Sequence, residues 1–198
     1  MGAEIEIKLR LAEPAALRRR LVELGAELRG TWFEINRLFD TPEKRLFKQD
    51  CGLRVRQIWH IDAGGPTSAT PAGAERGELT FKGPRSGDAV KSREEINVEV
   101  ADDAAAALIL ERLGFHESIR YEKRRQTWSL DPCEVVLDEL PRLGWFVEIE
   151  APSGREVEAC RAKLGLDGVE PIADTYVGLT EKHGDVTGAG GRALKFPA

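Results

Sequence analysis

Cysteine and histidine are scarce in this sequence: the 198 residues include three of each. Cys51, Cys133 and Cys160 are odd in number, lie far apart and form no CxxC pair. This pattern argues against a disulfide framework and against a zinc site. Any bound metal should therefore be held by oxygen ligands.

Long hydrophobic runs are also absent. No apolar stretch approaches the roughly 18 residues that a transmembrane helix needs. Glu4 and Glu6 interrupt the N-terminal segment that would have to be apolar in a signal peptide. We therefore expect a cytoplasmic protein that does not bind a membrane. The formal net charge of -5 disfavours a nucleic-acid partner, although cations could still gather inside a cleft.

The chain does contain enough apolar sequence for one sizeable core, since 41% of its residues are hydrophobic. We expect a single domain over residues 1–183. Residues 184–198 contain four glycines and show little periodicity. This composition predicts a disordered C-terminal tail.

Strands dominate the expected secondary structure, and the first strand shows a pattern that recurs. In residues 4–11 hydrophobic side chains alternate with charged ones, so one face needs a core and the other carries only charge. Further strands are predicted at 27–40, 52–59, 78–82, 91–100, 121–130, 134–138 and 145–150. Helices are predicted at 14–25, 103–113, about 153–163 and 173–183, with a helical turn at 43–49 and a mobile hairpin loop at 62–77.

Eight strands with so few covering helices favour an α+β fold, an eight-stranded antiparallel β-barrel with helices packed outside. If the charged faces point inward, the lumen holds both cations and acids. The cations are Lys8, Arg54, Arg56, Lys82, Lys123 and Arg125, and the acids are Glu4, Glu6, Glu95, Asp138, Glu148 and Glu150. Buried charges are tolerated only when they are paired or bind a charged ligand, so such an interior would hold water, metal and an anionic guest.

The alternative is an ordinary solvated sheet face with mixed salt bridges. Against it, several strands repeat one sign of charge at i and i+2, as in Arg54 with Arg56 and Glu148 with Glu150. Like charges side by side repel unless something lies between them. The repeated signs therefore favour a charged tunnel that contains a ligand.

The two signs of charge suit two chemistries. Arginine forks match phosphate oxygens bidentately and lysine adds a point charge, so the six cations suit a polyphosphate chain. Glu4, Glu6, Glu148 and Glu150, with Asp138 nearby, offer hard oxygen ligands for Mg²⁺ or Mn²⁺. Such metals could polarise a phosphorus and activate its attacker.

The sequence resembles the CYTH superfamily, the triphosphate tunnel metalloenzymes, through a series of motifs in order. These are ExExK at 4–8, LRVR at 53–56, LTFKGP at 79–84, KSREE at 91–95, LGF at 113–115, KRR at 123–125, LDEL at 137–140 and VEIE at 147–150. Their spacing is especially similar to the class IV adenylyl cyclase-like branch. ADTYVGL at 173–179 resembles the closing Ser-Tyr motif of the family, with Thr175 in place of serine.

The resemblance implies an eight-stranded antiparallel tunnel that binds a triphosphate-containing small molecule and a divalent metal. It implies that Lys8, Arg54, Arg56, Lys82, Lys123 and Arg125 bind phosphates and that Glu4, Glu6, Asp138, Glu148 and Glu150 surround the metal. Glu4, Glu6, Lys8 and Glu150 would be the catalytic residues. Glu95 matches a luminal acid that orients basic residues, and the family often works as a homodimer.

The resemblance leaves the reaction open. Because no base-specific signature is present, we favour a metal-dependent triphosphatase that acts on inorganic triphosphate or a nucleoside triphosphate. The alternatives are a class IV adenylyl cyclase, which makes cyclic AMP and pyrophosphate from ATP, and a non-catalytic sensor of polyphosphate or nucleotide. Gly52 stands where vertebrate-type thiamine triphosphatases carry an aromatic residue, which argues against thiamine triphosphate. The paired glutamates favour an enzyme over a sensor, because a pure binder gains nothing from clustered carboxylates.

Overall fold

The computed structural model of the chain describes residues 5–61, 76–84 and 94–197. Glu4, most of the expected hairpin loop and the first residues of the expected strand at 91–100 lie outside these ranges. Among the helices of the described residues, none has the length and hydropathy of a membrane-spanning segment.

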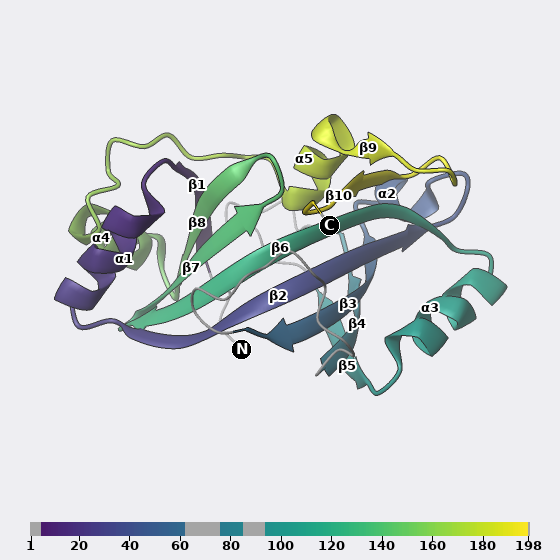
Figure 1. Cartoon of the computed structure of the whole chain (residues 1–198), viewed down its shortest axis with the longest axis horizontal. Coiled ribbons are helices and arrows are strands. Elements are labelled where there is room, and N and C mark those ends of the chain that lie inside the picture. Colours follow the sequence, from purple (N-terminus) through teal and green to yellow (C-terminus); the bar gives the residue numbers. More distant parts are fainter. Residues whose placement is uncertain (1–4, 62–75, 85–93, 198) are drawn as a thin grey trace. The chain divides into compact units, whose positions relative to one another are not determined.

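Most of the described secondary structure follows the alternation in the sequence (Figure 1). In chain order the elements are β1 (Ile5–Leu11), α1 (Pro14–Glu23), β2 (Glu27–Asp40), α2 (Arg45–Lys48), β3 (Gly52–His60), β4 (Arg76–Lys82), β5 (Glu95–Val100), α3 (Asp103–Arg112), β6 (His116–Leu130), β7 (Cys133–Leu140), β8 (Gly144–Ala151), α4 (Gly154–Lys163), α5 (Tyr176–His183), β9 (Asp185–Val186) and β10 (Arg192–Leu194). The strand β6 begins five residues earlier than expected, at His116 rather than at Tyr121. All the predicted helices and strands are therefore present with adjusted bounds.

The helix termini explain why the helices begin where they do. The side chains of Asp102, Ser153 and Thr175 each accept a hydrogen bond from a backbone N–H of the following first turn. The Ser153 hydroxyl accepts from the Glu156 backbone N–H at 3.3 Å and donates to the Glu156 carboxylate at 2.8 Å, so one of the two hydrogen bonds of the expected capping box is present. Gly25, at a φ of +75°, follows α1 in the left-handed conformation that glycine adopts at low cost.

The sheet is antiparallel in its main path. The strand order is β1-β8-β7-β6-β2-β3-β4-β5, and β10 joins β6 in parallel and β9 in antiparallel fashion. The described strands β1 and β5 end the path, so hydrogen bonds do not close it. The expected antiparallel sheet with helices packed on it is confirmed.

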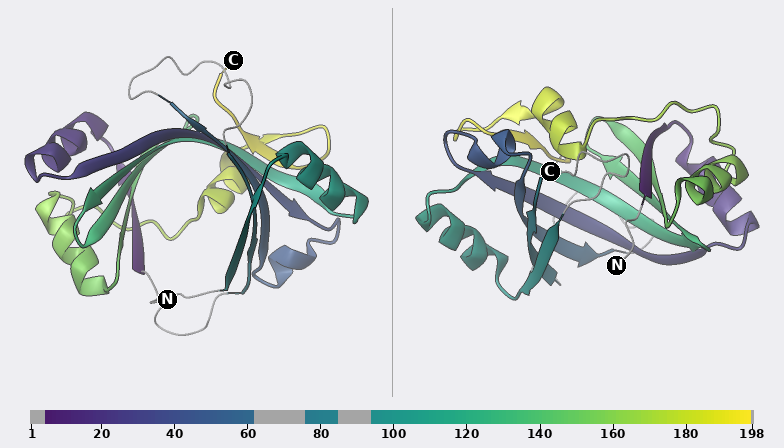
Figure 2. Two further views of the ribbon diagram at one scale, coloured as in Figure 1. Left: turned by 90° about the horizontal axis from the view of Figure 1, so that it is seen from below. Right: turned by 180° about the vertical axis from the view of Figure 1, so that it is seen from behind.

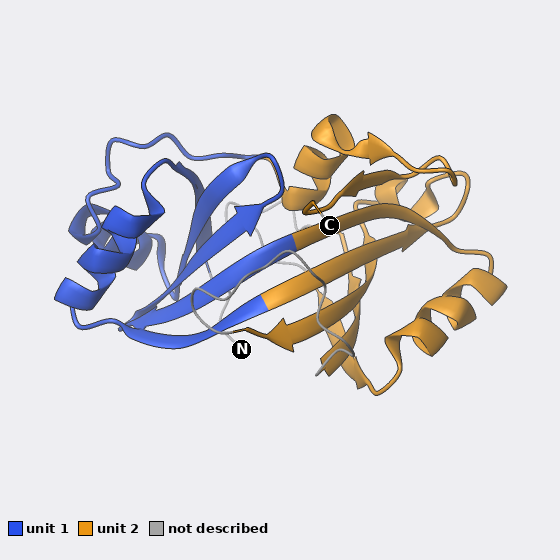
Figure 3. Ribbon diagram, viewed as in Figure 1, with its two compact units in different colours: residues 1–32, 123–173 blue, residues 33–122, 174–198 orange. Residues whose placement is uncertain are grey.

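The chain divides into two compact units (Figure 3). Unit 1 comprises Met1–Trp32 and Lys123–Ala173, and unit 2 comprises Phe33–Glu122 and Asp174–Ala198. The long strands β2 and β6 each contribute residues to both units. Each unit has its own core and its own group of charged residues.

In unit 1 the helices α1 and α4 cover the apolar face of β1, β8 and β7 (Figure 2). Leu17 and Leu21 of α1 and Val157 of α4 pack into one cluster with alternate residues of the strands, among them Leu9 and Val147. Full burial of a leucine or valine side chain stabilises the fold by about 1.5–3 kcal/mol. The opposite, charged face of the same strands is thereby left for the polar cluster described below.

In unit 2 the helix α3 has the equivalent role. Ala107 and Leu110 of α3 pack with Val55 of β3 and Phe39 of β2. Arg54 and Arg56, the neighbours of Val55 in sequence, therefore lie on the face of β3 that does not contact α3. The expectation that the apolar faces pack under the helices is confirmed in both units.

The C-terminal residues correct a sequence expectation. Residues 184–197 do not form a disordered tail, because β10 pairs in parallel with Ile119–Tyr121 of β6 and Leu194 is fully buried. Phe196 packs on Phe33, with ring centroids 6.2 Å apart. The apolar residues of this segment are too few to show a period in the sequence, and they gain their burial from other elements, among them β6 and Phe33 of β2.

Candidate functional site

The charged face of unit 1 is set by the strand register. Glu6 and Lys8 of β1 stand opposite Glu150 and Glu148 of β8, and Asp138 of β7 stands opposite Arg125 of β6. Because side chains alternate along each strand, the residues of these pairs point away from the apolar core of the unit. The sheet thus brings together charged residues from four strands.

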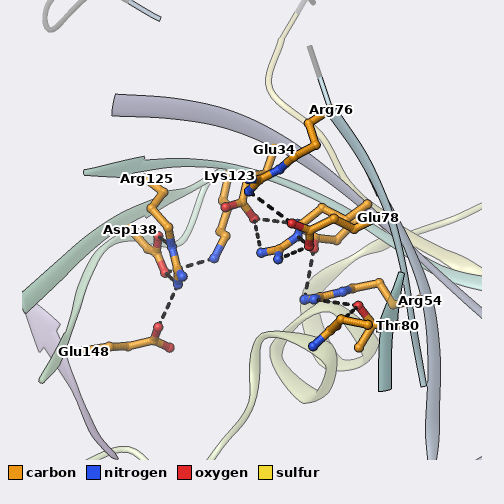
Figure 4. A network of polar contacts seen from close by, with 12 residues as sticks. Glu34, Arg54, Arg76, Glu78, Thr80, Lys123, Arg125, Asp138 and Glu148 are labelled. Atoms are coloured by element: carbon orange, nitrogen blue, oxygen red, sulfur yellow. Dashed lines mark hydrogen bonds and ion pairs between the residues drawn. The ribbon is translucent and has the colours of Figure 1, made fainter. Parts of the chain in front are cut away.

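Asp138 is the most deeply buried residue of this face, with no exposed surface. Its carboxylate accepts hydrogen bonds from Nε and Nη2 of Arg125 at 2.8 and 2.6 Å, and from Nζ of Lys123 at 3.3 Å (Figure 4). Such a bidentate arginine–carboxylate pair is short, charge-assisted and geometrically specific. Asp138 therefore holds Lys123 and Arg125 in place.

Glu148 links this pair to β1. Its Oε2 accepts from Nη2 of Arg125 at 2.8 Å, and its Oε1 lies 3.1 Å from Nζ of Lys8. The cations Lys8, Arg125 and Lys123 and the acids Glu148 and Asp138 therefore alternate in one continuous network. Each of the three cations therefore lies against at least one carboxylate, which offsets the cost of burying its charge.

Glu150 carries the perturbed carboxyl group of unit 1. Burial, together with the nearby negative charges of Glu6 and Glu148, raises its pKa to about 7 against the partial compensation of Arg125. Each carboxylate of this cluster makes ionisation of the others less favourable. A bound cation would stabilise their ionised forms.

The residues of unit 1 fit a divalent metal by their chemistry. Glu6, Glu148 and Glu150 offer hard oxygen donors and repel one another, which a bound Mg²⁺ or Mn²⁺ would relieve. Asp138 and Glu148 fit less well than Glu6 and Glu150, because both oxygens of Asp138 are bonded to Arg125 and Lys123 and both oxygens of Glu148 lie against Arg125 and Lys8. Within residues 5–61, 76–84 and 94–197, no group of three or more His, Cys, Asp or Glu side chains has the spacing of a formed metal site.

The raised pKa of Glu150 predicts a pH-dependent stability in the absence of metal. The folded protein holds this proton more tightly than the unfolded chain, so its stabilising effect is complete below pH 4.5 and is lost as the pH rises through about 7. In the presence of a metal chelator, raising the pH from 5 to 8 should therefore lower the melting temperature of wild type more than that of Glu150→Gln. Added Mg²⁺ or Mn²⁺ should restore wild type at pH 8 and not the variant; parallel melting curves would show that Glu150 titrates normally.

In unit 2 the charged face contains a pocket of about 300 Å³. Its lining combines two arginines of β3 with polar and acidic residues of β4 and β5: Arg54, Arg56, Glu78, Glu95, Asn97, Val98 and Glu99. The register places Arg54, Thr80 and Asn97 in one row across the three strands and Arg56, Glu78 and Glu99 in the next. The pocket therefore presents two guanidinium groups within a rim of hydrogen-bonding side chains.

Arg56 is held by acids on both neighbouring strands. Its Nε donates to Oε2 of Glu78 at 3.1 Å, its Nη2 bonds to the same oxygen, and its Nη1 lies 3.5 Å from Oε2 of the buried Glu34 on β2. Glu78 also pairs with Arg76 at 3.0 Å. Further along β4, Nζ of Lys82 bonds to Glu95 at 2.5 Å.

Arg54 is held by neutral groups instead. It donates to Oδ1 of Asn36 at 3.5 Å and to Oγ1 of Thr80 at 3.3 Å. Burial lowers the pKa of this guanidinium and the neighbouring Arg56 lowers it further, but an arginine remains protonated under such conditions. With no carboxylate hydrogen-bonded to it among the described residues, Arg54 has positive charge to offer an anion.

The structure groups the predicted site residues by unit. Unit 1 brings together Glu6, Lys8, Lys123, Arg125, Asp138, Glu148 and Glu150, and unit 2 brings together Arg54, Arg56, Lys82 and Glu95. Glu4 lies outside the described residues. Sequence reasoning did not select Glu34, Asn36, Glu78 and Thr80 as site residues, although Glu34 and Asn36 alternate with the buried Phe33 and Ile35 and could have been found from that pattern.

Comparison with known proteins shows to which family this chain belongs. The CYTH domain matches residues 2–176 of the chain. The chain belongs to the CYTH family. The adenylate cyclase CyaB of Aeromonas hydrophila is 29% identical to this CYTH protein over 192 residues, which cover 90% of the chain and 89% of the relative.

Solved structures share the fold of this CYTH protein. The PH1819 protein of Pyrococcus horikoshii is 26% identical, with a TM-score of 0.68 and coverage of 89% of this chain and 97% of that one. HpAC1 from Hippeastrum, an adenylyl cyclase candidate described as having a dominant triphosphatase activity, is 20% identical, with a TM-score of 0.61 and coverage of 87% and 92%. Enzymes of the CYTH superfamily bind triphosphate substrates and depend on divalent metal, so the cations and acids of the two units are of the kinds that such substrates require.

Proposed function

We propose that this CYTH protein is a divalent-metal-dependent triphosphatase that cleaves a phosphoanhydride bond of inorganic triphosphate or a nucleoside triphosphate. The observation that carries the proposal is the pair of arginines in the unit 2 pocket. Arg54 and Arg56 line a concave surface from one strand, and Arg54 has only neutral hydrogen-bond partners among the described residues. Two guanidinium groups side by side on a concave surface favour the binding of phosphate oxygens.

Each group of residues has a role in the proposed reaction. Arg54, Arg56 and Lys82 are the proposed phosphate-binding residues of unit 2, and Lys8, Lys123 and Arg125 are those of unit 1. Such cations offset the charge that moves onto the leaving group. Asp138 and Glu148 hold the unit 1 cations in position. Glu6, Glu148 and Glu150, with Glu4, would hold the divalent metal, which when bound would supply a Lewis acid for the phosphorus and for the attacking water.

The bond changes of a triphosphatase are simple. A water oxygen bonds to the terminal phosphorus while the bridging oxygen leaves with its electron pair, so inorganic triphosphate gives orthophosphate and pyrophosphate. The attacking water releases one proton to solvent as the new bond to phosphorus forms. No base-binding group is needed for this reaction.

Cyclase activity is the second candidate function, and the observation that favours it is the 29% identity to the A. hydrophila CyaB. A cyclase must hold the ribose 3′-hydroxyl in line with the α-phosphorus. None of the described pocket residues is an aromatic that could stack on adenine. We therefore place hydrolysis first.

The substrate test separates these reactions. We expect the purified protein to release orthophosphate from inorganic triphosphate in the presence of Mg²⁺ or Mn²⁺, at a higher rate than from ATP. The Glu6→Gln variant should lose this turnover at least a hundredfold, whereas Glu158→Gln, which removes a carboxylate on the exposed side of α4, should match wild type. Formation of cyclic AMP and pyrophosphate from ATP would establish a cyclase, and tight binding without turnover of either compound would establish a sensor.

A further inference from the structure

A hydrogen-bonded row in the unit 2 pocket runs from Arg54 through Thr80 to Asn97. The three residues are direct neighbours on β3, β4 and β5. Nη2 of Arg54 donates to Oγ1 of Thr80 at 3.3 Å (Figure 4). Oγ1 of Thr80 in turn donates to Oδ1 of Asn97 at 2.7 Å. Thr80 is fully buried, whereas Asn97 is exposed and lines the pocket.

The direction of these hydrogen bonds determines what Asn97 can offer. A guanidinium only donates, so the Thr80 oxygen must accept from Arg54, and its single proton then goes to the Asn97 carbonyl oxygen. With Oδ1 engaged, the amide nitrogen Nδ2 is the group of Asn97 that remains for a ligand. Thr80 thus sets the orientation of the Asn97 amide so that it acts as a donor.

The neighbours of Asn97 on β5 make this donor distinctive. Glu95 and Glu99 lie two residues before and after it, line the same pocket and can only accept hydrogen bonds when ionised. Among the described residues that line the pocket, Asn97 is the one neutral side chain with an N–H donor. An anionic oxygen held by Arg54 would therefore find its additional donor on β5 at Asn97 and nowhere else on that strand's polar face.

We propose that Asn97 is a substrate-binding residue whose Nδ2 donates to a non-bridging oxygen of the phosphate bound by Arg54, and that Thr80 is the positioning residue that orients it. The inference rests on the proposed binding of a triphosphate. It adds a neutral hydrogen-bond donor to the cationic residues and gives the buried Thr80 a function beyond satisfying Arg54. Thr80 and Asn97 act as one unit, because the donor is correctly oriented only while the hydroxyl is present.

The test uses shape-matched variants and measures binding apart from turnover. The dissociation constant of inorganic triphosphate would be measured by calorimetry without metal for wild type, Thr80→Val, Thr80→Ser, Asn97→Ala and the Thr80→Val/Asn97→Ala double variant. We expect each of Thr80→Val and Asn97→Ala to weaken binding about tenfold, the double variant to be no weaker than the single ones, and Thr80→Ser to match wild type. In turnover, Asn97→Ala should raise KM more than it lowers kcat.

Several outcomes would overturn the inference. Unchanged triphosphate binding in Asn97→Ala, or single effects that multiply in the double variant, would mean that Thr80 only satisfies Arg54. Should Thr80→Val fail to fold, Asn97→Ala and Asn97→Asp still test whether Asn97 binds the phosphate. The aspartate replaces the donor with a negative charge, so Asn97→Asp must bind triphosphate more weakly than Asn97→Ala. If wild type itself does not bind triphosphate, the proposed function fails, whereas normal wild-type binding with unaffected variants overturns the role of Asn97 alone.

Discussion

Replacing Asp138 with asparagine is expected to lower the free energy of unfolding by about 3–5 kcal/mol, because the change removes the fully buried negative charge that Lys123 and Arg125 share. Asp138 is fully buried and bonds to both Arg125 and Lys123. The asparagine has nearly the same shape, so lost packing contributes little. The loss is measured by urea unfolding at neutral pH.

The matched control for this prediction is Glu139→Gln on the same strand. Glu139 pairs with Arg124 at 2.8 Å on the opposite face, where both side chains are partly exposed. Such a pair contributes about 0–1 kcal/mol, so Glu139→Gln should change stability little. Equal losses in the two variants would show that Asp138 does not carry the charge network of unit 1.

The largest effect on ligand binding is expected from Arg56→Ala, which should weaken the binding of inorganic triphosphate about a hundredfold. A bidentate guanidinium–phosphate contact combines two charge-assisted hydrogen bonds, each stronger than a neutral one. Arg56 lines the unit 2 pocket and is held there by Glu78 and Glu34. Calorimetric titration with inorganic triphosphate measures the change directly.

Arg76→Ala is the control for Arg56→Ala. Arg76 pairs with the same carboxylate, Glu78, at 3.0 Å, but its side chain is 52% exposed and does not line the pocket. Both variants remove one positive charge and one partner of Glu78, but only Arg56→Ala removes a guanidinium from the pocket, together with its contact to Glu34. Arg76→Ala should keep triphosphate affinity within about twofold; a comparable loss in both variants would mean that net charge, rather than the pocket, binds the anion.

The alternation of apolar and charged residues along single strands could be predicted from the sequence. In β1, β3 and β8 every second residue is apolar, and the structure buries these faces under α1, α4 and α3. The same pattern indicated that Lys8, Arg54, Arg56 and Glu148 lie on the other faces. Local capping signals such as Ser153 with Glu156 likewise marked a helix start, because both partners lie within one turn.

The ion-pair and hydrogen-bond partners of each charged side chain could not be predicted from the sequence. Arg125 and Asp138 could be placed on polar faces, but the bidentate pair between them depends on the register of β6 with β7. The unit 2 row of Arg54, Thr80 and Asn97 depends in the same way on two registers among strands that are up to 43 residues apart in the sequence. A one-residue slip would send each of these side chains to the opposite face.

By itself, the sequence determined which residues alternate, where the helices begin and which charges a ligand could meet, because these properties arise within one strand or one turn. It also carried the ordered motifs of the CYTH family. Only the tertiary structure decided that Asp138 clamps Lys123 and Arg125, that Glu34 and Thr80 support the arginines of β3, and that β10 pairs with β6. These contacts join distant segments, and their energy comes from burial and strand register that no single segment possesses.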